Sequence, residues 1–147
     1  MVAFGFYGSS NSGKTQTIER LIGALKERDY DVIAVKHTHL DVRIDEGKDT
    51  ERFRSSGALC SALSAKDQSF IVFERSLGVE DLLRILEPIC DVVLVEGFRD
   101  ARIKKFVFGD AEPTEGTLFR YSAERFDDIL AIIERGISEA DRQDNLF

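Results

Sequence analysis

The sequence predicts an α/β fold in which a mostly parallel sheet carries helices on both faces. Continuous apolar runs, typical of parallel strands that are buried on both sides, occur at 2–7, 31–35 and 91–95. Apolar residues at helical spacing follow the first run, over 14–28. Because strands that alternate with helices favour parallel pairing through crossover connections, these observations define the fold class.

The middle of the chain predicts smaller elements. The polar stretch 37–48 is expected to be a surface loop, and Asp49 is expected to begin a short helix that ends near Gly57. The segments 59–63 and 69–73 have the composition of short strands.

The second half continues the alternation. A helix predicted over 79–86 ends before a proline, and an amphipathic helix is predicted over 126–137. The segments 105–108 and 117–121 flank a stretch rich in turn residues, which predicts an antiparallel pair at one edge of the sheet.

Length and composition limit the class of protein. With 147 residues, we expect one domain over 1–137 and a polar, frayed C-terminal tail over 138–147. The net charge of −7 argues against nonspecific nucleic-acid binding. No apolar run approaches the ~18 residues that a bilayer span needs, so we expect no membrane association and no signal peptide. Cys60 and Cys90 form no Cys-x-x-Cys pair, which fits a reducing cytoplasm.

The strongest functional signal is the segment GSSNSGKT at 8–15, which matches the P-loop pattern G-x-x-x-x-G-K-[ST] between a predicted strand and a predicted helix. Its glycines allow the backbone to wrap an anion, and successive N–H groups supply positive charge. Lys14 is expected to reach the β- and γ-phosphates, and the Thr15 hydroxyl is expected to ligate Mg²⁺. The predicted nucleotide-binding residues are Gly8, Ser9, Asn11, Ser12, Gly13, Lys14, Thr15, Gln16 and Arg52.

A P-loop also needs an acidic partner for the metal, and Glu96 stands at the carboxyl end of the strand predicted over 91–95. Asp91 begins the same strand and lies roughly 16 Å away at ~3.3 Å per residue, so we exclude it as a ligand. The alternative is that Glu96 is only a surface residue at the end of its strand.

The stretch after the second predicted strand adds candidates from the loop and the following helix. Asp45 and Asp49 are candidates to orient water, Asp49 is also a candidate metal ligand, and Arg52 is a candidate phosphate contact. Together with Lys14, the two aspartates are the predicted catalytic residues. Alternatively, Asp49 caps the helix and Arg52 lies on a solvated face. His37 and His39 are weak as a metal motif.

A cluster of basic residues follows Glu96 in an otherwise acidic chain: Arg99, Arg102, Lys104 and Lys105. They are candidates to receive a second anionic ligand or an acidic partner protein, and the alternative is a solvated loop. The Asn-Lys-x-Asp motif that reads guanine is absent from the sequence, so the residues alone leave guanine and adenine open.

Several segments together resemble the MobB family, molybdopterin-guanine dinucleotide biosynthesis protein B. They are the P-loop, VKHTH at 35–39, GKDTER at 47–52 followed by Gly57-Ala58, VEGFR at 95–99, and FDDI at 126–129. The resemblance covers nearly the whole chain. It implies a three-layer P-loop NTPase fold and a GTP-binding protein with weak GTPase activity, usually a homodimer. Such a protein assists the guanylyltransferase MobA in attaching GMP to molybdopterin.

The resemblance also implies roles for individual residues. Gly13, Lys14 and Thr15 would bind phosphate and Mg²⁺, and the same site would be lined by Asp49, Arg52 and Glu96. Two departures from the family pattern are Leu40, where a histidine often stands, and Arg99, where lysine is commoner. Both fall near the surface expected for a second ligand, so direct binding of molybdopterin stays open.

Two other functions compete with this hypothesis. An ATP-dependent small-molecule kinase would need an arginine-rich lid, and the only candidate, 99–105, is short. A GTPase that delivers metal would use His37 and His39, but two histidines and two scattered cysteines make a poor metal store. The GTP-dependent accessory protein is therefore the leading hypothesis.

Overall fold

The computed structural model describes residues 1–42 and 48–144, so the predicted residue Asp45 lies outside the described residues. The chain forms two compact units. The larger unit comprises Met1–Thr38 and Val79–Phe147, and the smaller comprises His39–Gly78. The larger unit therefore contains the P-loop segment and Glu96, whereas the candidate residues Asp49 and Arg52 belong to the smaller one.

A five-stranded parallel sheet forms the centre of the larger unit. Its strands stand in the order β2-β5-β1-β6-β7, with β1 in the middle. Their bounds are β1 Val2–Gly8, β2 Val32–Lys36, β5 Val92–Glu96, β6 Lys104–Phe108 and β7 Thr117–Arg120. The chain passes from β1 to one side of the sheet and later returns to the other side. In parallel α/β sheets this switch point, beyond the carboxyl ends of the strands, is where ligands bind.

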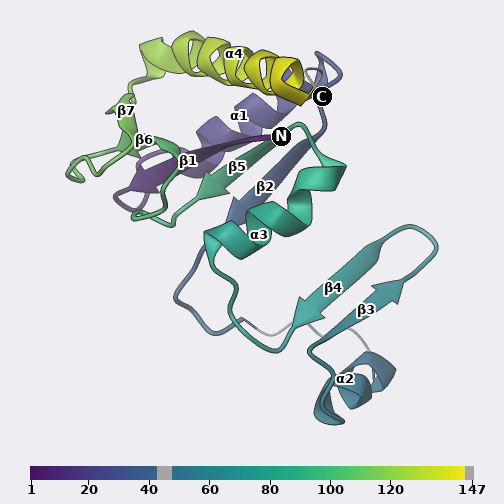
Figure 1. Cartoon of the computed structure of the whole chain (residues 1–147). Helices are drawn as coiled ribbons and strands as arrows, with labels where there is room; N and C mark the ends of the chain where they lie inside the picture. The colour runs from purple at the N-terminus through teal and green to yellow at the C-terminus, as the bar shows by residue number, and fades with distance from the viewer. Residues whose placement is uncertain (43–47, 145–147) are drawn as a thin grey trace. The chain divides into compact units, whose positions relative to one another are not determined.

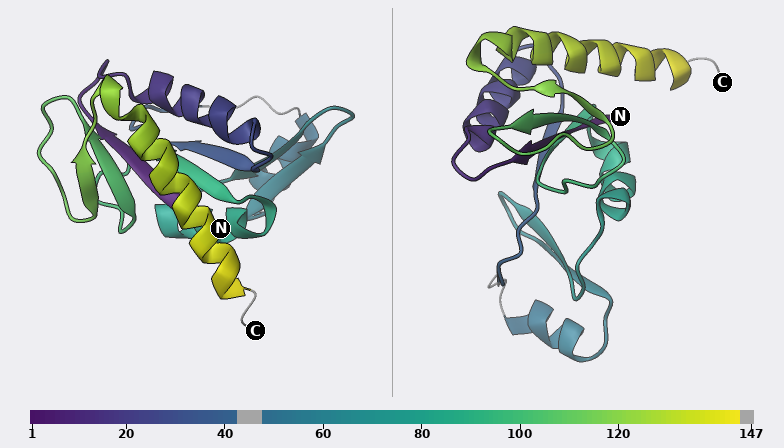
Figure 2. Two further views of the ribbon diagram at one scale, coloured as in Figure 1. Left: turned by 90° about the horizontal axis from the view of Figure 1, so that it is seen from above. Right: turned by 90° about the vertical axis from the view of Figure 1, so that its left-hand side faces the viewer.

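Helices cover both faces of this sheet, as Figure 1 shows. The helices α1 (Lys14–Lys26) and α4 (Phe126–Asp144) lie side by side on one face, which Figure 2 shows from two further directions. The helix α3 (Val79–Leu86) lies on the other face. Two short 3-10 turns, Glu87–Ile89 and Ala123–Arg125, complete the unit. The three-layer arrangement predicted from the sequence is confirmed.

The core follows the two-residue alternation of buried strands. Phe4, Phe6 and Leu94 pack against α1 and α4, while Val93 and Val95 pack against α3. A strand that is buried on both faces needs apolar residues at successive positions, which explains the continuous runs in the sequence.

The last helix is longer than the sequence indicated. Its buried stripe ends at Ile137, which is 2% exposed, but α4 continues through Ser138 to Asp144. The polar segment expected as a frayed tail is therefore helical as far as Asp144. The change from apolar to polar residues after Ile137 marks the point where the helix leaves the core, not the point where it ends.

The smaller unit contains the antiparallel pair of the fold. The helix α2 (Lys48–Ser55) precedes β3 (Cys60–Ser64) and β4 (Ser69–Phe73), which pair antiparallel as a separate sheet. Arg54 of α2 binds Glu74 and Ser61, which ties the helix to this hairpin. Because α2 begins at Lys48, Asp49 lies inside its first turn and does not precede the helix as a cap.

The antiparallel edge predicted for 105–108 and 117–121 is wrong, because β6 and β7 pair in parallel, with Lys105 opposite Thr117 and Val107 opposite Arg120. The eight residues between the strands span up to about 26 Å, enough to run back along a strand of about 17 Å. The Tyr7 hydroxyl holds this return segment and accepts a hydrogen bond from the Thr114 N–H at 2.8 Å. The proline and glycine that suggest a hairpin belong to this return.

A short connection joins β5 to β6 across β1. Parallel crossovers usually need a dozen or more residues, most often a helix, but here 97–103 suffices. The backbone carbonyls of this connection have no helical hydrogen bonds, and Lys105 supplies donors for two of them. Its ammonium donates hydrogen bonds to the carbonyls of Arg99 and Ala101, both at 2.8 Å.

Lys105 is 1% exposed, so it is not part of the exposed basic segment that the sequence suggested. Gly5 makes room for it, since a Cβ there would lie 2.6 Å from the Lys105 Cγ. The residue is a structural clamp under the crossover and cannot contact an external anion.

We predict that Lys105→Met destabilises the protein by about 1–3 kcal/mol, because the buried Ala101 carbonyl loses the ammonium that binds it and the Arg99 carbonyl keeps only the Thr114 hydroxyl. Urea unfolding measures the change in the free energy of unfolding. Lys104→Met removes the same charge from an exposed neighbour and is expected to have almost no effect. Equal stability of both variants would contradict the clamp.

Candidate nucleotide site

The P-loop segment leaves the carboxyl end of the central strand. Gly8 has a φ of +138°, and a Cβ at this position would lie 2.0 Å from the Phe108 carbonyl oxygen, so only glycine fits. The Ser9 N–H donates to the same carbonyl at 3.3 Å. The end of β6 therefore supports the start of the loop.

The loop ends at the first turn of α1. Gly13 precedes the helix with a φ of +88° and no side chain, and Asn11 also has a positive φ, of 58°. The Thr17 hydroxyl donates to the Gly13 carbonyl at 2.9 Å, which fixes the start of the helix. A helix N-terminus with free N–H groups beside a glycine-rich loop is suited to bind phosphate.

Lys14 lies across this loop. Its ammonium donates to the carbonyls of Gly8 at 3.2 Å and Ser9 at 2.5 Å, and the Ser12 hydroxyl donates to the Ser9 carbonyl at 2.7 Å. The predicted residues between Gly8 and Lys14 therefore lie together in the loop that joins β1 to α1. Asn11, Thr15 and Gln16 are exposed at the same place, where a ligand can reach them.

Glu96 joins the loop from the neighbouring strand. Its Oε2 accepts a hydrogen bond from the Thr15 hydroxyl at 2.8 Å, and its Oε1 accepts one from the Lys36 ammonium at 2.8 Å. The Glu96 side chain is 14% exposed, whereas that of Lys36 is 63% exposed. The structure therefore brings Thr15 and Glu96, the two metal ligands predicted from this unit, into contact.

These contacts decide the ionisation of the carboxylate. Burial alone would raise the pKa of Glu96, but the hydrogen bonds from Lys36 and Thr15 and the charges of Lys36 and Lys14 outweigh it. The pKa of Glu96 is therefore lowered from its ordinary value of 4.5, and the group is a carboxylate at neutral pH.

The donor set suits Mg²⁺. This ion prefers oxygen ligands and keeps waters and substrate phosphates in its shell, so one carboxylate and one hydroxyl are enough from the protein. Within 1–42 and 48–144, no group of three or more His, Cys, Asp or Glu side chains could hold a metal ion. A hydroxyl and a carboxylate beside a phosphate loop fit Mg²⁺ better than they fit a transition metal.

The histidines differ in their surroundings. The His37 ring stacks on Phe98, with 4.2 Å between ring centroids, beside the turn at Gly97 that follows Glu96. Gly97 has a φ of +95° there, and a Cβ would lie 3.0 Å from the Cβ of His37. His39 is exposed and belongs to the smaller unit. The stacking gives His37 a packing role in the turn that begins at Glu96.

Asp49 and Arg52 lie on α2, where they pair with each other at 3.6 Å on an exposed face. Each side chain is more than 80% exposed, at 83% and 81%. Their predicted contacts with nucleotide or metal, like the role of Asp45, stay predictions.

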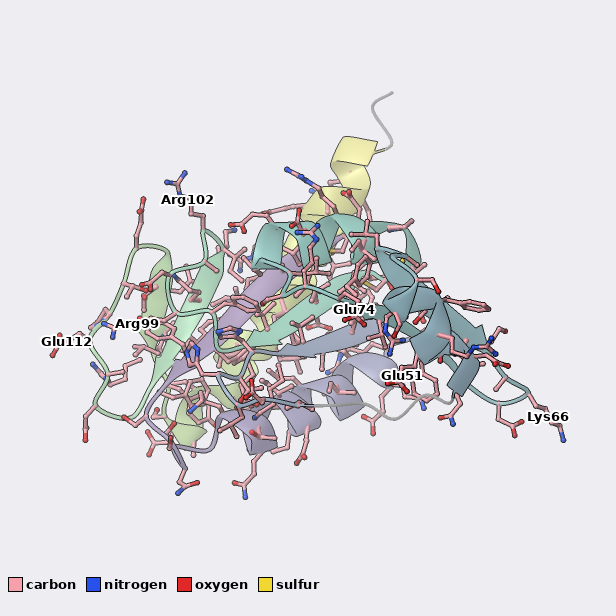
Figure 3. The ribbon with its side chains drawn as sticks, turned by 90° about the horizontal axis from the view of Figure 1, so that it is seen from below. Glu51, Lys66, Glu74, Arg99, Arg102 and Glu112 are labelled. Carbon is pink, nitrogen blue, oxygen red and sulfur yellow. The ribbon has the colours of Figure 1, made fainter. Side chains whose placement is uncertain are left out.

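The basic residues after Glu96 separate into two kinds. Arg99, Arg102 and Lys104 are exposed, and Figure 3 shows Arg102 projecting outward from the ribbon. The carbonyl of Arg99 is held by Lys105 and also by the Thr114 hydroxyl, at 3.1 Å. The backbone of this segment is therefore fixed, although its arginine side chains reach into solvent.

The sequence interpretation missed Lys36 as a site residue. Lys36 ends β2 directly opposite Glu96, which ends β5. Each is the first charged residue after a run of apolar positions, and this shared pattern is the signal that could have paired them. Nothing in the sequence, however, shows that β2 and β5 are neighbours.

The comparison with known families is decisive. The model of the family described as MobB, molybdopterin guanine dinucleotide synthesis protein B, matches residues 3–135. The chain belongs to the MobB family.

Curated relatives agree with this assignment. A Haemophilus influenzae protein named molybdopterin-guanine dinucleotide biosynthesis adapter protein is 33% identical over 115 residues, which are 76% of this chain and 65% of the relative. The Escherichia coli protein of the same name is 33% identical over 109 residues, 69% of this chain and 62% of the relative. An archaeal relative from Methanocaldococcus jannaschii is 36% identical over 103 residues, 69% of this chain and 42% of the relative. The chain thus spans less than two thirds of the length of these relatives.

Solved structures agree on the fold of this MobB-family chain. The crystal structure of Bacillus subtilis MobB superposes with a TM-score of 0.67 at 18% identity, covering 89% of this chain and 97% of that one. A MobB homologue from Bacillus stearothermophilus gives a TM-score of 0.62 at 22% identity, covering 95% and 99%. These likenesses confirm that the chain has the fold of the MobB proteins. No helix in the described part of the chain has the length and apolar character of a membrane span.

We predict that the Glu96 contacts stabilise the protein in a pH-dependent way. Because the folded pKa lies below the ordinary value of 4.5, the stabilisation is fully present above pH 4.5 and is lost as the pH falls through the folded pKa. Glu96→Gln is therefore expected to be less stable than wild type at pH 7, with a difference that shrinks below pH 4.5. Urea unfolding at several pH values measures this difference.

The control is Glu19→Gln, which changes an exposed carboxylate on α1. Its difference from wild type is expected to stay small at every pH. A Glu96→Gln difference that does not shrink in acid would show that the carboxylate's charge does not stabilise the fold.

Proposed function

We propose that the protein is a GTP-binding adapter of molybdenum cofactor biosynthesis, which assists the attachment of GMP to molybdopterin to form molybdopterin guanine dinucleotide. The observation that carries this proposal is the contact between Thr15 of the P-loop and Glu96 of β5, inside a MobB-family fold. The curated relatives named as adapters of this biosynthesis support the pathway.

In this proposal the loop residues 8–16 hold the phosphates of GTP. Lys14 binds the β- and γ-phosphates, and the N–H groups at the start of α1 face the anion. Thr15 and Glu96 hold Mg²⁺, with Asp49 as a further ligand and Arg52 as a further phosphate contact. The bound ion would neutralise phosphate charge that the protein alone leaves unbalanced.

The GTPase activity proposed is weak. Lys14 stabilises the charge that develops on the transferred phosphoryl group, and Asp45 or Asp49 orients the attacking water. The segment 8–15 contains no arginine, so the P-loop itself supplies no arginine finger. Slow turnover suits an adapter that acts on its partner while the nucleotide stays bound.

The partners proposed are a second copy of the chain and a MobA-type guanylyltransferase, with molybdopterin as a further candidate ligand, in the cytoplasm. Large apolar side chains stay exposed on the smaller unit, which favours burial in an interface. They are Leu40, Val42, Phe53, Leu59 and Ile71.

The alternative, an ATP-dependent small-molecule kinase, is not favoured. Its lid would have to come from the basic segment after Glu96, but Lys105 and Thr114 hold the Arg99 carbonyl there. A segment whose backbone is fixed in this way is poorly suited to open and close over a substrate.

We predict that the protein binds GTP in preference to ATP and that Lys14→Ala weakens GTP binding at least tenfold, about 1.4 kcal/mol. Titration with fluorescent analogues of both nucleotides, with and without Mg²⁺, measures the affinities, and the absence of tryptophan leaves the signal clear. Lys26→Ala, an exposed lysine at the end of α1, is the control and is expected to bind like wild type.

A preference for ATP would favour the kinase and direct attention to an acceptor substrate. Unchanged GTP binding by Lys14→Ala would refute the assignment of the P-loop as the nucleotide site.

A further inference from the structure

Lys36 and Glu96 are neighbours across two parallel strands. In the register of β2 and β5, Lys36 lies opposite Glu96, just as Ala34 lies opposite Leu94. Residues two apart on a strand share a face, so the pair lies on the face that Leu94 shares with the core under α1. Thr15 stands in the first turn of that same helix.

Both oxygens of the Glu96 carboxylate are therefore engaged, from opposite sides. Oε2 receives the Thr15 hydroxyl and Oε1 receives the Lys36 ammonium, each at 2.8 Å. The predicted metal ligand thus already has a cation within direct contact. That cation belongs to the protein.

Lys36 is placed to act through Glu96 and not on the nucleotide. In the sheet order, β5 separates β2 from β1, from which the P-loop continues. At about 4.8 Å between strands, the backbone of β2 lies about 10 Å from that of β1. The Lys36 side chain extends across the intervening strand β5 and ends at the Glu96 carboxylate.

The two members of the pair differ in exposure. Glu96 is 14% exposed and is held in place by Thr15, whereas Lys36 is 63% exposed. The ammonium, already mostly hydrated, can therefore turn into water by giving up one exposed ion pair, while the carboxylate stays beside the P-loop. An exposed ion pair of this kind is weak, so a metal ion can displace the ammonium from the carboxylate. The ammonium is also close enough to repel a second cation at the same carboxylate.

We propose that Lys36 is a positioning residue that acts as the resident counter-cation of Glu96 and competes with Mg²⁺ for this carboxylate. Two cations that share one carboxylate repel each other, so Lys36 raises the Mg²⁺ concentration at which the nucleotide site takes up its metal. The inference rests on the proposed nucleotide site, and it adds a residue that sets the metal requirement of that site.

The test is a Mg²⁺ titration of the full chain at a fixed concentration of a fluorescent GTP analogue. Lys36→Met keeps an unbranched side chain that is one atom shorter and removes its charge, and it is expected to lower the Mg²⁺ midpoint about fivefold, the effect of one partly exposed pair. Lys36→Arg keeps the charge and is expected to restore a midpoint near that of wild type. Lys26→Met, which removes an exposed lysine from α1, controls for the change in net charge.

Nucleotide affinity in EDTA separates the inference from simpler explanations. It is expected to be the same for wild type and Lys36→Met, because the lysine does not contact phosphate. A loss of affinity in EDTA would make Lys36 a phosphate ligand and overturn the inference. A midpoint that is unchanged or higher in Lys36→Met would also overturn it.

The proposed function fails in a different way. If wild type binds no GTP analogue at any Mg²⁺ concentration, the nucleotide site itself is refuted. If wild type binds and the midpoints of wild type and Lys36→Met agree, only the competition is refuted. Thermal unfolding of each variant establishes that the comparison is between folded proteins.

Discussion

The hydrogen bond from the Thr15 hydroxyl to the Glu96 carboxylate, 2.8 Å long, joins two residues that are 81 positions apart in the chain. It exists because β5 pairs directly with β1, so that the end of β5 lies beside the loop that leaves β1. This carboxylate balances the charge of Lys36, and in the proposed function it also holds the metal. The chemistry of the larger unit therefore depends on one pairing of strands.

The buried strands and the P-loop could be predicted from the sequence, because burial and backbone conformation constrain the residues locally. A strand that is buried on both faces must be continuously apolar, which located β1, β2 and β5. The P-loop pattern is carried by glycines whose backbone angles other residues rarely adopt, as at Gly8 and Gly13. Glu96 was predicted as a metal ligand from its position at the end of a buried strand, where ligands bind in parallel sheets, and the structure places it in contact with Thr15.

The remaining features depend on which strands are neighbours in the sheet, and the two-residue alternation within a strand carries no information about its neighbours. The pattern around 105–121 fitted a hairpin, yet the strands pair in parallel, and the return segment between them is held by the Tyr7 hydroxyl of β1. Lys105 looked like a surface residue among other basic residues, but Gly5 of another strand makes the space that buries it. Lys36 could be assigned to Glu96 only once β2 was known to lie beside β5.

In the proposed function, the P-loop and Glu96 form one site for a nucleotide and a divalent cation. A crystal structure of the protein with a non-hydrolysable GTP analogue and Mn²⁺, located by its anomalous scattering, tests it most directly. We expect the phosphates inside the loop at 8–15 and the metal about 2.1 Å from the Thr15 hydroxyl, as for an octahedral magnesium site, on the side of Glu96. A nucleotide bound outside this loop, or a metal remote from Thr15 and Glu96, would show that the two do not form one site.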